Sequence, residues 1–132
     1  MSGSTRSMRT PLGRVRAHGA SGEGTGHFIA VRVTSIALAV LAVWFVISVG
    51  LAMPVANYQS AIDYLTLPVN AVGVLLLVLT SLYHMHLGMQ EVILDYVHKP
   101  VGKAVLLLLN TFVPVILGAG AIFAVLMINF GA

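Results

Sequence analysis

The chain has 132 residues, of which 58% are hydrophobic and only 8% are charged, against about 25% charged residues in soluble domains. So few charges cannot cover the surface of a water-soluble globule, and the absence of cysteine excludes disulfides, thiolate zinc sites and cysteine-bound iron–sulfur clusters. The net charge of +3 does not indicate nucleic-acid binding, because the cations lie where membrane topology places them.

Residues 1–26 are rich in Gly, Ser and Arg and poor in large apolar side chains. Such a segment buries too little apolar surface to offset its ordering entropy, so we expect an extended arm that orders only against a partner. Its many arginines and single acid, Glu23, would also fit a mitochondrial transit peptide. It does not resemble a secretory signal, because no short apolar stretch with a cleavage site follows it.

Three long apolar stretches follow the arm and predict helices at about residues 29–53, 66–97 and 101–130. Each exceeds the roughly 20 residues that a membrane-spanning helix needs, and helices are the plausible spanning form here. Pro68 suits a first helical turn, whereas Pro114 removes a backbone donor and predicts a kink. We therefore expect an all-α membrane protein, with residues 27–132 forming one three-helix transmembrane anchor.

The positions of the cations predict the orientation of this anchor. All seven Lys and Arg residues lie in the N-terminal region, up to Arg32, or in the loop between the second and third helices, at Lys99 and Lys103. The positive-inside rule then places the N-terminus and that loop on the cytoplasmic (or matrix) side.

Polar side chains at membrane depth are costly, so each is a functional candidate. Most of them are near the end of the second helix, and helical spacing predicts that six residues share one stripe: Leu77, Thr80, His84, Gly88, Glu91 and Asp95. Gly88 would leave a groove one turn from His84, in which a flat ligand such as a haem could lie with His84 on its iron. Other interpretations of His84 are an interhelical hydrogen bond and a proton relay.

The remaining polar candidates have simpler alternatives. His86 points about 200° away from His84, so the two cannot bind the same face of one metal, and a structural or interfacial role is expected for His86. Asp95 and Tyr96, about 16 Å along the helix from His84, could bind a quinone carbonyl or could simply be interfacial. Arg32 could pair with a haem propionate or extend to lipid phosphate.

These residues resemble a known family, the small hydrophobic membrane anchor of succinate dehydrogenase (respiratory complex II). The similarity rests on His84-x-x-x-Gly88-Met89 followed by Asp95-Tyr96-Val97, and on three N-terminal segments: Thr10-Pro11-Leu12-Gly13-Arg14-Val15-Arg16, Gly26-His27-Phe28 and Val31-Arg32-Val33-Thr34. It covers essentially the whole chain. The arm resembles retained bacterial sequence, which favours a multi-pass protein of the bacterial inner membrane over a mitochondrial one.

The resemblance implies a role that spacing alone does not give. His84 would be one axial ligand of a haem b shared with a second, cytochrome b anchor, and Arg32 would lie near a haem propionate. Tyr96 would hydrogen-bond ubiquinone, with Asp95 beside it. Flavoprotein and iron–sulfur subunits would deliver electrons from succinate, so this chain would be a non-catalytic anchor of an oxidoreductase in electron transport and the tricarboxylic acid cycle.

The pattern also departs from the family at His86, Gln90 and Glu91. Glu91, on the His84 stripe, would perturb the haem or serve a proton route. Two alternatives remain: the same anchor in a quinol:fumarate reductase, and a non-redox small membrane component of a transporter or an assembly factor.

Overall fold

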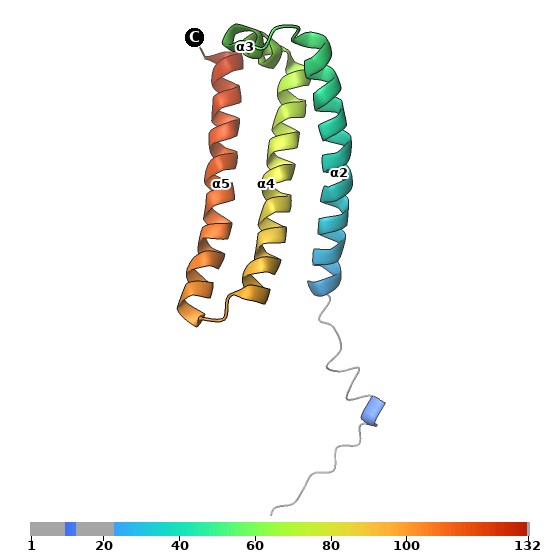
Figure 1. Cartoon of the computed structure of the whole chain (residues 1–132), viewed down its shortest axis with the longest axis vertical. Helices are drawn as coiled ribbons and strands as arrows, with labels where there is room; N and C mark the ends of the chain where they lie inside the picture. Colours follow the sequence, from blue (N-terminus) through green and yellow to red (C-terminus); the bar gives the residue numbers. More distant parts are fainter. Residues whose placement is uncertain (1–9, 13–22, 132) are drawn as a thin grey trace, which may run out of the picture.

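The computed structural model of this chain describes residues 10–12 and 23–131, so most of the expected arm lies outside the described residues. Four helices follow one another in the second range: α2 (Glu23–Ala52), α3 (Tyr58–Thr66), α4 (Pro68–Tyr96) and α5 (Pro100–Phe130) (Figure 1). α2, α4 and α5 are each long and apolar enough to cross a membrane. The expected all-α architecture with three spans is therefore confirmed for the described part of the chain.

The helix boundaries differ from the expected ones at two places. α2 begins at Glu23, so residues 23–26, which were assigned to the arm, are helical. The segment between the first two spans was expected to be a connection, but it contains the short helix α3. α4 and α5 both begin with proline, which has no N–H to leave unpaired at the first turn, and α5 continues through Pro114.

α3 starts at a capping box. The side chain of Asn57 accepts a hydrogen bond from the backbone N–H of Ser60 at 2.8 Å, and the Ser60 hydroxyl accepts one from the backbone N–H of Asn57 at 3.2 Å. These reciprocal bonds satisfy amide donors that the first helical turn would leave without partners. They help to explain why a helix of only nine residues forms here.

α3 connects the three long helices at one end of the molecule (Figure 1). The hydroxyl of Tyr64 lies 2.8 Å from that of Ser48 in α2. The amide of Asn70 in α4 donates to the Tyr64 carbonyl at 3.1 Å, and the amide of Asn129 in α5 donates to the Leu65 carbonyl at 3.0 Å. Every long helix is thus bonded to α3.

α4 lies between α2 and α5 and packs against both (Figure 1). Small residues allow this close approach, as is typical of membrane helices. A side chain at Gly73 of α4 would overlap the Trp44 ring of α2, and a Cβ at Gly118 of α5 would lie 3.2 Å from a methyl group of Leu79. The outer faces carry many exposed large apolar residues, which suits contact with lipid or with other proteins.

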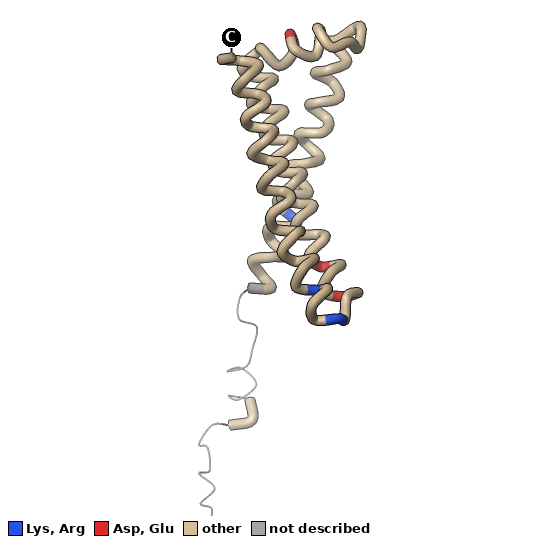
Figure 2. Tube along the Cα trace, turned by 90° about the vertical axis from the view of Figure 1, so that its left-hand side faces the viewer, with Lys and Arg blue, Asp and Glu red and all other residues tan. Residues whose placement is uncertain are grey.

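Charged residues are concentrated toward the end of the molecule where α4 joins α5 (Figure 2). Asp63, in α3, is the described acid at the opposite end. This separation follows the charge pattern from which the cytoplasmic position of the N-terminus was predicted; the orientation itself stays a prediction of the positive-inside rule.

Candidate functional site

His84 lies on the face of α4 that packs against α2. Its Nδ1 atom is 2.8 Å from the hydroxyl oxygen of Thr34. Thr34 is buried, with 9% of its surface exposed. The same hydroxyl lies 2.7 Å from the carbonyl oxygen of Ala30 and 3.1 Å from that of Val31, one turn earlier in α2. The interhelical hydrogen bond considered for His84 is therefore present.

The contacts of Thr34 favour one tautomer of His84. A hydroxyl has one proton, and a backbone carbonyl can only accept, so the short contact of 2.7 Å to the Ala30 carbonyl favours donation of the Thr34 proton to that oxygen. The hydroxyl then accepts from His84, which places a proton on Nδ1. In the neutral ring, Nε2 is left with its lone pair free. Nε2 is the atom that would be available to a metal.

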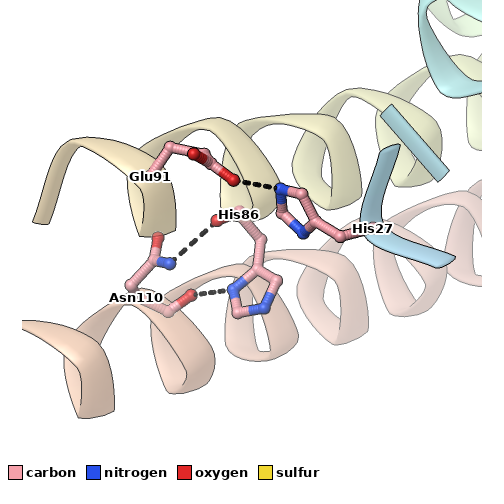
Figure 3. Close-up of polar contacts among 4 residues, drawn as sticks. All are labelled: His27, His86, Glu91 and Asn110. Carbon is pink, nitrogen blue, oxygen red and sulfur yellow. Dashed lines mark hydrogen bonds and ion pairs between the residues drawn. The ribbon is translucent and has the colours of Figure 1, made fainter. Parts of the chain in front are cut away.

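His86 points to the other neighbour of α4. Its Nδ1 lies 2.7 Å from the backbone carbonyl oxygen of Asn110 in α5, and the Asn110 side-chain amide donates to the His86 carbonyl at 2.9 Å (Figure 3). A carbonyl only accepts, so Nδ1 of His86 also carries a proton. His86 therefore holds α5 against α4, in agreement with the structural role expected for it.

The open space beside His84 is on the surface of this chain. Gly88 is exposed, and a Cβ built there would meet no atom within 4 Å. A groove of about 540 Å³ lies between α4 and α5 and is lined by Tyr83 and His86, among others, rather than by His84. A ligand seated beside His84 and Gly88 would need a second polypeptide to cover it.

A second polar pair links α2 and α4 near the same end. Nε2 of His27 in α2 lies 2.6 Å from Oε1 of Glu91 in α4 (Figure 3). The distance is that of an ion pair, but the angle is not that of a hydrogen bond, and Nε2 itself is shielded from solvent. His27 had little signal in the sequence, and this contact makes it a candidate functional residue.

The pairs Thr34–His84 and His27–Glu91 fit a single antiparallel register of α2 against α4. His27 and Thr34 are seven residues apart in α2, and His84 and Glu91 are seven apart in α4. Seven residues make about two helical turns, so both pairs fall on the same line of contact. His84 and Glu91 of the predicted stripe are thus turned toward α2, whereas Gly88 between them borders open space.

Arg32 is not part of this line. It is exposed, and its guanidinium carbon lies 5.0 Å from the ring centroid of Phe28, one turn earlier, which is a cation–π contact. Arg32 precedes Thr34 by two residues, so it points about 160° away from the Thr34 side chain. Any group that Arg32 binds lies outside the contact between α2 and α4.

Asp95 and Tyr96 are the last two residues of α4, and both are exposed, Tyr96 by 77%. The chain therefore leaves both side chains free to contact another molecule, and it does not itself enclose a pocket around them. Among the described residues, no group of three His, Asp or Glu side chains is arranged to hold a bare metal ion.

Comparisons with known proteins agree on one family. A family model described as succinate dehydrogenase/fumarate reductase transmembrane subunit matches residues 6–126. Relatives in Rickettsia bellii (33% identical over 97 residues, 70% of this chain and 74% of the relative) and Rickettsia conorii (32% over 99 residues, 70% and 75%) are both named succinate dehydrogenase hydrophobic membrane anchor subunit. A third relative of the same name, from Rickettsia felis, is 37% identical over 86 residues, covering 61% and 68%. No solved structure matches this chain significantly.

Proposed function

Because this chain belongs to the succinate dehydrogenase/fumarate reductase transmembrane subunit family, as a succinate dehydrogenase membrane anchor, we propose that His84 is an axial ligand of a shared haem b and that Tyr96 helps to reduce a quinone. The three spans make it a membrane protein, and the bacterial relatives indicate the inner membrane of a bacterial cell. The membrane, together with its lipid, is thus the setting of the proposed chemistry.

The hydrogen bond between Thr34 and His84 is the observation that carries the haem proposal. Metal-bound histidines usually donate their other ring N–H to an acceptor, which fixes the tautomer and raises the basicity of the ligating nitrogen. Thr34 fills that role, so the imidazole has Nε2 ready for the iron. Bound haem b would supply a one-electron redox centre at this position.

The surroundings of His84 fit a flat, shared group. Gly88, one turn along α4, leaves space where any side chain would project. His86 cannot be the second ligand, because its ring is directed to α5 and bonded to Asn110. We propose that a second ligand would come from a neighbouring polypeptide, the cytochrome b anchor of the same complex.

Arg32 is proposed to bind a haem propionate. Its side chain is exposed beside Phe28, on a face of α2 that no other described helix covers extensively. A guanidinium pairs well with a carboxylate, particularly in a bidentate arrangement. The propionate would have to reach Arg32 around the edge of α2, because Arg32 is turned away from Thr34.

The quinone site is proposed at the end of α4. The Tyr96 hydroxyl would donate to a quinone carbonyl oxygen, and the adjacent Asp95 would exchange protons with it. Tyr96 is 77% exposed, so the iron–sulfur protein and the cytochrome b anchor would have to complete the pocket. Electrons would reach it from succinate through the flavoprotein and iron–sulfur subunits, with ubiquinone as the acceptor.

The optical spectrum of the purified complex tests the haem assignment. The wild-type complex should show a b-type haem that is lost in His84→Ala and retained in His86→Ala, because only His84 has a free ligating nitrogen toward the shared face. A haem that disappears in His86→Ala and survives in His84→Ala would contradict the assignment.

Activity with two acceptors tests the quinone assignment. Tyr96→Phe should lower succinate:ubiquinone reductase activity while the reduction of a soluble dye by succinate persists, since the dye does not need this site. Tyr58→Phe, at the α3 end, is a matched control that should leave both activities unchanged. Full quinone reduction by Tyr96→Phe would remove the support for Tyr96.

A further inference from the structure

The pair formed by His27 and Glu91 has no part in the function proposed so far. Its two members differ in their access to water. Nε2 of His27 is shielded from solvent, whereas the Glu91 side chain is 57% exposed. The two atoms lie only 2.6 Å apart, so a turn of the His27 ring that brings Nε2 into line with the Glu91 oxygen would let a proton pass between them. Glu91 is thus the more solvent-accessible member of the pair, since the His27 side chain as a whole is 27% exposed.

Its position along α4 relates this pair to the proposed chemistry. Glu91 lies seven residues from His84 and one turn before Asp95, on the same face of the helix. At 1.5 Å per residue, Glu91 is about 6 Å along the axis from Asp95 and about 10 Å from His84. A proton released at Glu91 is therefore one turn away from the residues assigned to the quinone.

Building on the proposed function, we propose that Glu91 and His27 form a proton relay that supplies the quinone site of this chain. Reduction of a quinone takes two electrons and two protons and forms two new O–H bonds. The electrons come from succinate through the partner proteins of the complex. The relay releases the two protons, one after the other, through Asp95 to the quinone oxygens, and the exposed Glu91 carboxylate regains each of them from water. The bond that breaks is the O–H or N–H bond of the pair, and the bond that forms is the quinol O–H.

The ionisable neighbours of the pair leave this route open. α2 and α4 are the two helices that pack here. On α4 the nearest such groups are Asp95 toward the aqueous end and His84 toward the membrane interior. On α2, Glu23 is four residues before His27 and Arg32 is five residues after it, and Arg32 stacks on Phe28. Among the described side chains, Glu91 forms its ion pair with His27.

The test is the pH profile of succinate:ubiquinone reductase activity in membranes that contain the assembled complex. Glu91→Gln cannot carry a proton, so its rate should fall roughly tenfold at about pH 8, where protons are scarce, and much less at about pH 6. Glu91→Asp, which keeps a carboxyl group, should restore most of the rate. Dye reduction and the haem spectrum should stay as in the wild type, because neither depends on the relay.

Two further variants separate the relay from other roles. His27→Gln keeps a polar group of similar length but cannot exchange a proton, so it should reproduce the pH profile of Glu91→Gln and provides the test if that variant does not assemble. Asp63→Asn changes an exposed acid at the opposite end and should behave as wild type. A wild-type pH profile in both relay variants would overturn the proposal, as would a loss of rate that only follows a loss of haem. Failure of the proposed function would appear separately, as full quinone reduction in Tyr96→Phe.

Discussion

The carbonyl oxygen of Asn110 accepts its hydrogen bond from His86 of a neighbouring helix, and it is the carbonyl that Pro114 leaves without a helical donor. In an α-helix the N–H of residue i bonds the carbonyl of residue i−4, and proline has no N–H. His86 thus repairs from α4 the defect that Pro114 introduces into α5. The contact gives a structural role to a histidine on the α5 side of α4.

This relationship predicts a coupled effect on stability. His86→Phe should leave the Asn110 carbonyl unpaired, at a local cost of about 1–3 kcal/mol, and lower the midpoint of thermal denaturation of the solubilised complex. Pro114→Ala supplies the missing N–H, so His86→Phe should cost clearly less in that background. Equal shifts of the midpoint in the two backgrounds would show that the bond to His86 does not compensate for the proline.

Thr34→Val should weaken haem binding without removing the ligand. Valine has nearly the shape of threonine but cannot accept the proton on Nδ1 of His84, and loss of such a partner typically lowers metal affinity about 10–100-fold. The midpoint potential should rise, because a less basic ligand stabilises ferric iron less. Haem retention during detergent purification and a redox titration measure the two effects. Thr34→Ser keeps the hydroxyl and should resemble wild type; a Thr34→Val complex with unchanged potential and retention would contradict the role of Thr34.

Gly88→Leu should exclude the haem. The position faces open space in this chain, since a Cβ there meets no atom within 4 Å, so the added side chain would extend into the space proposed for the haem. Gly120→Leu makes the same change at another open glycine, in α5, and should retain the haem. The haem-to-protein ratio of the two purified complexes distinguishes them. A full complement of haem in Gly88→Leu would place the group elsewhere.

Gly73→Ala should destabilise the contact between α2 and α4. Even a methyl group would overlap the Trp44 ring, and such overpacking typically costs about 1–3 kcal/mol. Gly50→Ala adds the same methyl group where nothing lies within 4 Å, so it should be neutral or stabilising. The thermal midpoints of the two complexes provide the comparison, and a stable Gly73→Ala complex would mean that Trp44 moves aside at little cost.

The sequence predicted the architecture well because membrane spans depend on local composition. Uninterrupted apolar length is sufficient to locate each span, and helical phase is sufficient to separate the faces of His84 and His86. The helix α3 was missed because its hydrophobic content is low, although Asn57 and Ser60, three residues apart, carry the signal of a capping box.

The contacts between helices could not be predicted in the same way. The pairing of His27 with Glu91 depends on the axial position of α2 relative to α4. No local sequence pattern in either helix determines that register. The roles of His84, Arg32, Asp95 and Tyr96 in binding haem and quinone stay predictions, since they depend on groups and polypeptides outside this chain.

The position of α3 gives the three long helices unequal freedom at their two ends. At the α3 end, bonds through Tyr64 and Leu65 join all of them. Toward the other end, Thr34 and His27 of α2 contact α4 through their side chains, and these contacts are distant from the hydrogen bonds to α3. Separating α2 from α4 at this end would break the polar contacts Thr34–His84 and His27–Glu91 without breaking a backbone hydrogen bond, and His84 lies between the two helices where they would separate.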